Sequence, residues 1–411
     1  MSATPRKVLI VDDEYERSSE WAKVITAFDF AGIKAEALTI TDAQHAISIA
    51  NQRRADARSG KNPFDGSTQC VLDDVDVLIV DYDLQDLVDA SQWSTGLQVV
   101  TLARAFTRAK AIVLVNQFGT NSFDLTLTKA IASNADLDVG SGQLCNPSLW
   151  EPSKRAGFAP WTWADGVIAA ADRMDATIRW VTERLDDSVL ASLGFTADSE
   201  QADAPNFIQP DLWQGCVADP TTTFREMVSE SEFLTSKDRD AFVNFDEPCA
   251  RVAASIVAHW LDRWVIPANE VLIDLPHIAS IYPWLLKDRD DIGIWQTTCT
   301  AAGVDVMLEP LGKHLFAPGF PISRPAVWRK AVLADPDLAE PAGFTYDDFP
   351  DVVFCEDVSC FVDFKRSRSF SSRLPDSDPQ RFVSDGEEGK STKEEFPTSA
   401  VSYEPSVLFA L

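Results

Sequence analysis

The chain has 411 residues, which exceeds one ordinary hydrophobic core and predicts two domains. Its formal charge of -28, from 36 Lys and Arg against 64 Asp and Glu, argues against a nucleic-acid-binding surface. No window approaches the roughly 18 apolar residues of a membrane span, and no signal peptide is visible. The seven Cys are an odd number without a CxxC pair, so we expect reduced thiols in a cytoplasmic protein.

The first part of the chain alternates between short β-rich apolar runs and helical patterns. The expected strands are Lys7–Val11, Lys34–Thr39, Asp76–Val80, Lys110–Val115 and a weaker one over Ala135–Val139. Helices are expected over Glu14–Phe28, from Asp42 onward and over Thr95–Phe106, and the polar segment 53–68 fits either an inserted loop or an extended helix end. This alternation predicts an α/β fold with a doubly wound, parallel five-stranded sheet.

Two of the expected strands end at acidic residues. Asp12 and Asp13 follow the first apolar run, and Asp81 follows the third. A single Asp after a strand is commonly a turn former or a helix N-cap. Ligands of open parallel sheets, however, bind beyond the carboxyl ends of the strands, where these three carboxylates would crowd together. Such a cluster repels itself unless a cation is present, and an all-oxygen site suits Mg²⁺.

This pattern resembles the receiver domain of two-component response regulators. The resemblance is carried by Asp12 and Asp13 after the first strand, Asp81 after the third, and Gly96 at the start of the next helix. It implies that Asp81 accepts a phosphoryl group from a histidine kinase. It also implies that Asp12 and Asp13 hold Mg²⁺ directly or through water, with the main-chain carbonyl of Asp83 as a third ligand. A carboxylate can attack phosphorus to form an acyl phosphate, and a metal neutralises the transferring oxygens.

The sequence departs from the receiver pattern at two positions. Asn116 stands where receivers have a Ser or Thr, and the stretch Asn134–Gly140 lacks the Lys that ends the fifth strand in that family. Both changes are compatible with Mg²⁺-dependent phosphorylation. They put in doubt the conformational switch by which receivers respond to the phosphoryl group. A phosphate sink or buffer is therefore a second possibility within this class. The Trp-rich segment that follows is similar to a variant class encoded in bacterial conflict and antiphage systems beside sensor kinases.

We expect five segments along the chain. They are a receiver-like domain over 1–145, a Trp- and Pro-rich strap with a long amphipathic helix over 146–187, an acidic linker over 188–225, a C-terminal α or α+β domain over 226–364, and a polar mobile tail with an apolar end over 365–411. In the second segment, Ala164–Leu185 has apolar residues at helical intervals. That helix would either pack on the receiver or mediate dimers.

The second half offers fewer chemical signals. Asp274 and His277 could form an acid–base pair, but without a nearby nucleophile we favour a buried, hydrogen-bonded His. Helices are expected over Pro248–Trp264 and Pro325–Ala334, the latter with Pro at its first position. Cys355 and Cys360 are interpreted as core thiols.

The sequence thus predicts a signalling protein that accepts phosphate at Asp81 rather than an enzyme with turnover. Its expected partners are a histidine kinase and a downstream effector protein, and a homodimer is left open. We expect it to bind neither nucleic acid nor a membrane. One alternative is a pseudo-receiver that serves as a protein-binding scaffold without phosphorylation. Another is an effector enzyme in the C-terminal half, for which Asp274 and His277 are the first candidates.

Overall fold

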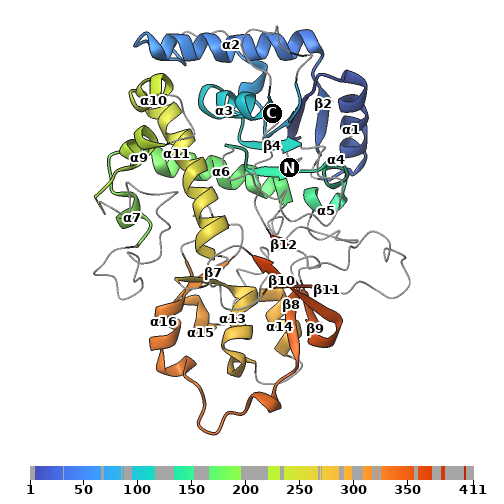
Figure 1. The fold of residues 1–411 in the computed structure, drawn as a ribbon, viewed down its shortest axis with the longest axis vertical. Coiled ribbons are helices and arrows are strands. Elements are labelled where there is room, and N and C mark those ends of the chain that lie inside the picture. The colour runs from blue at the N-terminus through green and yellow to red at the C-terminus, as the bar shows by residue number, and fades with distance from the viewer. Residues whose placement is uncertain are drawn as a thin grey trace.

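The computed structural model describes residues 5–30, 32–65, 69–84, 87, 95–115, 134–151, 166–195, 221–231, 236–266, 269, 271–286, 291–298, 309–316, 322, 325–355, 360–372, 381–384 and 402–403. Its first part contains a parallel five-stranded sheet (Figure 1). The strands are β1 (Lys7–Val11), β2 (Lys34–Ala37), β3 (Val77–Asp81), β4 (Ala111–Val115) and β5 (Leu137–Val139). Their order, β2-β1-β3-β4-β5, is that of flavodoxin-like α/β folds, with the switch point between β1 and β3. The predicted parallel sheet is confirmed.

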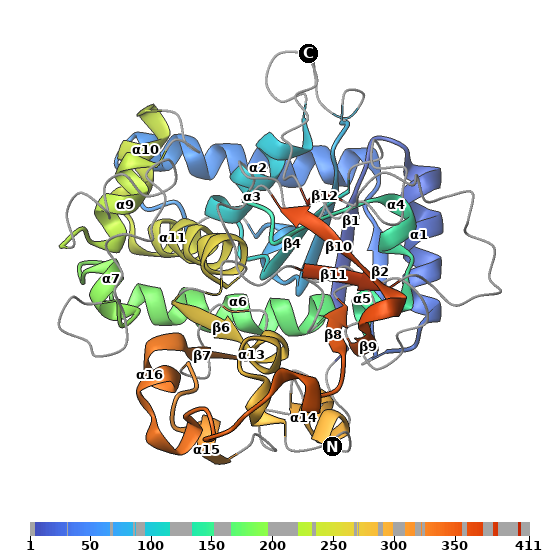
Figure 2. The same cartoon turned by 60° about the horizontal axis from the view of Figure 1, so that its bottom comes forward.

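Helices cover both faces of this sheet because its strands are apolar on both sides. The helices are α1 (Tyr15–Ala27), α2 (Ile40–Arg58), α3 (Gly96–Phe106), α4 (Ser141–Leu144), α5 (Pro147–Trp150) and α6 (Gly166–Thr182). Alternate strand residues point to opposite faces. Those of one face pack with α1, α5 and α6, and those of the other with α2 and α3. Figure 2 shows α2 and α6 on opposite sides of the sheet. The long helix expected over Ala164–Leu185 therefore packs on the sheet, and the polar segment after residue 53 begins as an extension of α2.

A second group of helices packs against this α/β unit. It comprises α7 (Val189–Ser192), α9 (Phe224–Glu230), α10 (Ser236–Val243) and α11 (Asp246–Trp260), which continues into one π-helical turn over Leu261–Val265. One hydrophobic cluster contains side chains of the sheet, of α2 and α3, and of all four of these helices. Residues 189–195, at the start of the expected acidic linker, contribute Val189, Leu190, Leu193 and Phe195 to that cluster. The core of the α/β unit thus extends across the expected linker.

Helix α11 is held at the amino-terminal edge of the sheet by polar contacts to main-chain carbonyls. The donors are Arg251, Ser255 and His259, all of them buried. The acceptors belong to Arg104 and Ala109 before β4 and to Asn134 and Ala135 before β5. This edge is opposite the one at which Asp81 ends β3. Helix α11 is therefore attached away from the carboxyl edge of the sheet, at which Asp81 lies.

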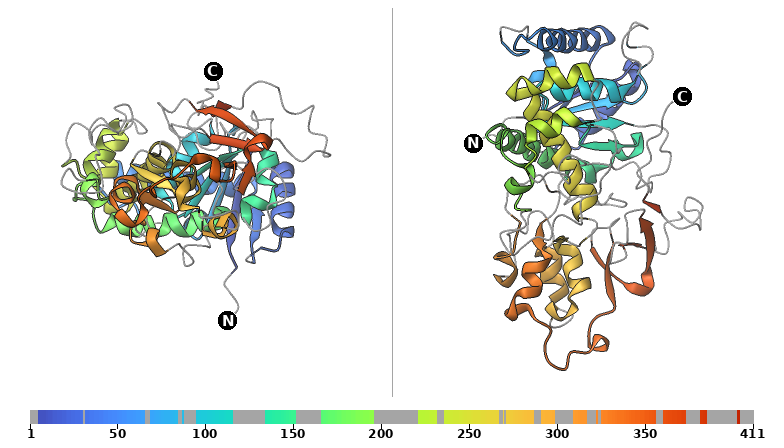
Figure 3. Two further views of the ribbon diagram at one scale, coloured as in Figure 1. Left: turned by 90° about the horizontal axis from the view of Figure 1, so that it is seen from below. Right: turned by 60° about the vertical axis from the view of Figure 1, so that its left-hand side comes forward.

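The remaining elements lie at the opposite end of the molecule from the parallel sheet (Figure 1; Figure 3, right). Strands β6 (Leu272–Asp274) and β7 (Ala326–Trp328) pair antiparallel, with α13 (Leu275–Ile281), α14 (Asp291–Thr298), α15 (Glu309–Gly312) and α16 (Arg329–Ala334) around them. The helix predicted from Pro325 is wrong in its first turn, because residues 326–328 pair with β6 and the helix begins at Arg329.

A mixed sheet completes this part of the chain. It contains β8 (Val352–Cys355), β9 (Cys360–Asp363), β10 (Ser367–Ser372), β11 (Arg381–Ser384) and β12 (Ser402–Tyr403), in the order β12-β10-β11-β8-β9. Strands β10 to β12 fall within the stretch expected to be a polar mobile tail. Among the described helices, none combines the length and the apolar character needed to cross a bilayer.

Candidate functional site

The structure brings the three predicted carboxylates together at the carboxyl edge of the sheet. Strands β1 and β3 pair in register, with Val11 opposite Val80, so that the next residues, Asp12 and Asp81, leave the sheet side by side. Ligand atoms of Asp12, Asp13 and Asp81 all lie within 4.8 Å of one another. The sequence correctly predicted this cluster, because the ends of neighbouring parallel strands meet at one edge.

Asp81 is in an unusual state for a carboxylate. Its side chain is fully buried, and its Oδ1 has no hydrogen-bond partner among the described residues. Burial raises the pKa of Asp81 to about 7, and the neighbouring negative charges of Asp12 and Asp13 act in the same direction, whereas Arg17 opposes them. A buried carboxylate oxygen without a partner is destabilising, and beside two further carboxylates it leaves a position that a cation could occupy.

A fourth residue, Arg17, belongs to the site and was missed in the sequence. It lies in the first turn of α1, and its Nε and Nη2 donate to Oδ2 and Oδ1 of Asp12 at 3.0 and 2.8 Å. The same Nη2 donates to Asp81 Oδ2 at 2.9 Å and lies 3.7 Å from Asp13 Oδ1. The guanidinium thus bridges the two buried carboxylates. The available signal was the four-residue interval from Asp13 to Arg17, which places both on one side of a helix start.

Gly96 is explained by a close approach of two chain segments. The start of α3 packs against the end of β3, and the main-chain N–H of Gly96 donates to the carbonyl of Tyr82 at 2.7 Å. A Cβ at position 96 would lie only 2.1 Å from the main-chain oxygen of Asp81. Only glycine fits this position without moving the backbone. The N-terminus of α3, which carries a partial positive charge, is thereby placed beside the acidic cluster.

The other predicted site residues are placed less completely. Asp83 forms an isolated antiparallel bridge with Thr95, the N-cap of α3, and the role of its main-chain carbonyl as a metal ligand stays a prediction. Asn116 lies outside the described residues. At the end of β5, where the resemblance calls for a Lys, the chain has Val139 and Gly140, and the described residues 134–140 contain no Lys.

The donor set fits a divalent cation. Three carboxylates and one guanidinium leave two negative charges when all four groups are ionised, and carboxylate oxygens are the ligands that Mg²⁺ prefers. The unpartnered Oδ1 of Asp81 provides a coordination position that no described residue satisfies. The structure therefore supports a site that could bind a metal ion at Asp12, Asp13 and Asp81, as the sequence predicted.

The second candidate pair, Asp274 and His277, forms a buried hydrogen bond. Its Oδ1 and Nδ1 are 2.6 Å apart, both side chains are buried, and the imidazole meets the ring of Phe354 edge-on at 5.5 Å. The pair joins the start of α13 to β6 and to β8. These contacts agree with the buried, hydrogen-bonded His favoured from the sequence. Cys355 is buried as predicted, whereas Cys360, which lies opposite it in the β8–β9 ladder, is only half-buried.

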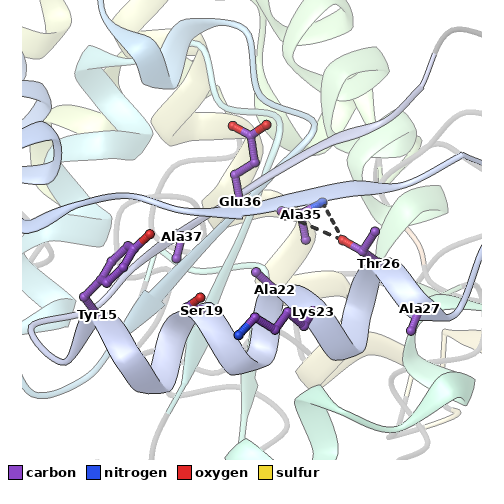
Figure 4. Close-up of a pocket in the computed structure, with 9 residues that line it drawn as sticks. All are labelled: Tyr15, Ser19, Ala22, Lys23, Thr26, Ala27, Ala35, Glu36 and Ala37. Atoms are coloured by element: carbon purple, nitrogen blue, oxygen red, sulfur yellow. Dashed lines mark hydrogen bonds between the residues drawn. The ribbon is translucent and has the colours of Figure 1, made fainter.

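An open groove lies between α1 and the edge strand β2 (Figure 4). It has a volume of about 630 Å³ and includes none of the three clustered carboxylates. Small side chains dominate its lining, which consists of Tyr15, Ser19, Ala22, Lys23, Thr26, Ala27, Ala35, Glu36 and Ala37. The hydroxyl of Thr26 accepts from the main-chain N–H of Ala35 at 3.2 Å and so ties α1 to β2. The acidic site, which brings three carboxylates together, is the stronger functional candidate.

Comparisons with protein-family models, with curated proteins and with solved structures give no significant match for this chain.

Proposed function

We propose that this protein accepts a phosphoryl group at Asp81 in a reaction that requires a divalent cation, and that it acts as a receiver-like signalling protein. One observation carries the proposal. Asp81 is a fully buried carboxylate with an unpartnered oxygen, positioned beside two further carboxylates at the carboxyl edge of a flavodoxin-like sheet. Asp136 also has a buried Oδ1 without a partner, but it is paired with Arg104 in the core, whereas Asp81 lies in a cluster of three carboxylates.

The chemistry assigns a distinct role to each residue. In the transfer, a carboxylate oxygen of Asp81 forms a bond to phosphorus while the bond from phosphorus to the donor breaks. With a histidine kinase as donor, the electron pair of the P–N bond leaves with the imidazole, which takes up one proton. A divalent ion held by Asp12 and Asp13 would neutralise charge on the transferring oxygens. The bound ion would also counter the negative charges of Asp12 and Asp13, which raise the pKa of Asp81, and so would favour the ionised, nucleophilic form of Asp81.

The identity of the donor follows from the resemblance and stays a prediction, as do a defence-system setting and a role as phosphate sink. A role as phosphate sink is consistent with the missing fifth-strand Lys. That cation would otherwise bind the phosphoryl group and couple phosphorylation to a change in the conformation of the domain. A non-phosphorylated scaffold is the second candidate. It is favoured by Arg17, which already supplies a positive charge to the cluster through contacts of 2.8 and 2.9 Å.

The proposal is tested by incubation with acetyl phosphate and Mg²⁺, followed by electrophoresis in a phosphate-binding gel. The wild type should give a retarded band that disappears with EDTA and in Asp81→Asn. Asp76→Asn is the matched control, because Asp76 precedes the same strand at its opposite end and should leave the retarded band in place. A band that persists in Asp81→Asn would refute the assignment of the acceptor. Absence of the band in the wild type, both with acetyl phosphate and with a phosphorylated histidine kinase, would favour the scaffold.

A further inference from the structure

Arg17 occupies the position in which a cation would bridge the two buried carboxylates. Its Nη2 lies 2.8 Å from Asp12 Oδ1 and 2.9 Å from Asp81 Oδ2. The Nε of the same group donates to Asp12 Oδ2 at 3.0 Å, so both oxygens of Asp12 carry hydrogen bonds from Arg17. Asp12 Oδ1 also accepts the main-chain N–H of Glu14 at 2.9 Å. A carboxylate oxygen has two lone pairs, and both on Asp12 Oδ1 are in use.

These contacts conflict with direct binding of a divalent ion by Asp12. A metal at the bridging position would need the lone pairs that Nη2 now uses. It would also lie within a few ångström of a guanidinium charge, where the repulsion between like charges in a partly buried site is strong. The contact between Arg17 and Asp12 therefore has to open before Asp12 can coordinate the ion.

Two neighbours of Arg17 outside the cluster, Trp21 and Glu14, already lie close enough to receive its charge. Its side chain is 24% exposed, in contrast to the fully buried carboxylates that it contacts. Its guanidinium carbon lies 5.4 Å from the centre of the Trp21 ring, and Nη1 lies 3.7 Å from Glu14 Oε2. Glu14 is largely exposed at the mouth of the site. A small rotation of the Arg17 side chain toward Trp21 and Glu14 would keep its charge paired while releasing Asp12 and Asp81.

We propose that Arg17 is a built-in occupant of the acidic site, and that it alternates there with the divalent cation required for phosphoryl transfer. The inference rests on the proposed metal site. In the metal-free protein Arg17 keeps Asp12 and Asp81 together and offsets their repulsion. When the ion binds, Arg17 moves out to Trp21 and Glu14. Arg17 thereby sets the cation concentration at which Asp81 becomes competent to accept a phosphoryl group.

Calorimetric titration of the full chain with MgCl₂ at a fixed pH above 7 tests this inference. Arg17→Gln should bind Mg²⁺ at least about tenfold more tightly than the wild type, which corresponds to about 1.4 kcal/mol. Arg108→Gln is the matched control, because it removes an arginine that is paired with Glu247 on the surface. It should leave the affinity unchanged. Asp12→Asn should weaken or abolish binding and so locates the ion.

A second measurement separates direct competition from a general change in charge. The Nε–H signal of Arg17 in a ¹⁵N-correlated NMR spectrum, assigned by its loss in Arg17→Gln, should shift during the Mg²⁺ titration as the hydrogen bond to Asp12 breaks. An affinity in Arg17→Gln equal to or weaker than that of the wild type would overturn the inference and leave the metal site intact. A stationary signal during saturation with Mg²⁺ would also overturn it. Absence of binding in both proteins would contradict the alternation and the proposed metal requirement together.

Discussion

Replacing Asp81 by Asn should stabilise the protein, and this stabilisation should depend on pH. The pKa of Asp81 in the folded protein is about 7, raised first by burial and then by the charge of Asp12, against an ordinary value of 3.8. Between these two values the folded state binds more protons than the unfolded state. The free energy of unfolding therefore falls as pH rises through this interval. The side-chain amide in Asp81→Asn would be neutral throughout, so the variant would not share that loss.

The expected size follows from the shift in pKa. About three pKa units correspond to roughly 4 kcal/mol at a pH well above 7, since one unit equals about 1.36 kcal/mol. The attraction between the carboxylate and Arg17 is already included in this shift, because Arg17 lowers the pKa of Asp81. The net stabilisation of Asp81→Asn should thus be about 4 kcal/mol at a pH near 8.5. It should decline toward zero as the solution becomes acidic and approaches the ordinary carboxyl pKa.

Urea unfolding in EDTA, followed by circular dichroism from mildly acidic to mildly alkaline pH, measures this difference. Asp76→Asn, directly before the same strand, is a control of opposite sign. Burial alone would raise the pKa of Asp76, but hydrogen bonds from Lys110 and from the main-chain N–H of Lys7 lower it. The carboxylate of Asp76 stabilises the fold at neutral pH, and this contribution is lost as pH falls through the lowered pKa of Asp76. Asp76→Asn should therefore be less stable than the wild type at alkaline pH. A destabilised Asp81→Asn, or a gain that does not vary with pH, would refute the reasoning.

Two further substitutions test the packing that supports the site. Gly96→Ala should destabilise the protein by at least about 2 kcal/mol, because the new Cβ would lie 2.1 Å from a main-chain oxygen at the end of β3. Gly142→Ala, where nothing lies within 4 Å of an added Cβ, should change stability by less than about 1 kcal/mol in the same thermal unfolding assay. Arg104→Met should destabilise by about 3–5 kcal/mol, since it leaves the carboxylate of Asp136 buried without its charged partner. Arg108→Met, at the surface, should lose less than about 1 kcal/mol, and equal losses in the two variants would contradict this view of the core.

The sheet and the acidic cluster could be predicted because they depend on local pattern and on a general rule of topology. Runs such as Val8–Val11 and Val77–Val80 are apolar at every position, as buried parallel strands are. Strand ends then collect at one edge, which places Asp12 beside Asp81. The bridging role of Arg17 was not predictable in the same way. An arginine in the first turns of a helix is normally solvated, and only the three-dimensional path of the side chain shows that it enters the cluster.

The second half was predicted less well because its elements are short or polar. The strand Ala326–Trp328 has three residues, and the preceding Pro325 gave a stronger signal for a helix start. The segment Ser367–Ser372 contains one large apolar residue in six and has the composition of a mobile tail, yet it pairs with its neighbours in a sheet. In both cases the strand is determined by long-range pairing, which composition does not reveal. Residues 189–195 likewise join the hydrophobic core through long-range packing, which composition does not reveal.

Identification of the modified residue tests phosphoryl transfer to Asp81 without relying on gel mobility. The wild type is incubated with acetyl phosphate and Mg²⁺ and then reduced with borohydride, which converts an aspartyl phosphate to homoserine. The protein is digested, and the peptide that contains Asp12 and Asp13 is compared with the one that contains Asp81 by mass spectrometry. We expect homoserine at position 81 alone, and only when Mg²⁺ is present. Homoserine at position 12 or 13, or its complete absence, would contradict phosphoryl transfer to Asp81.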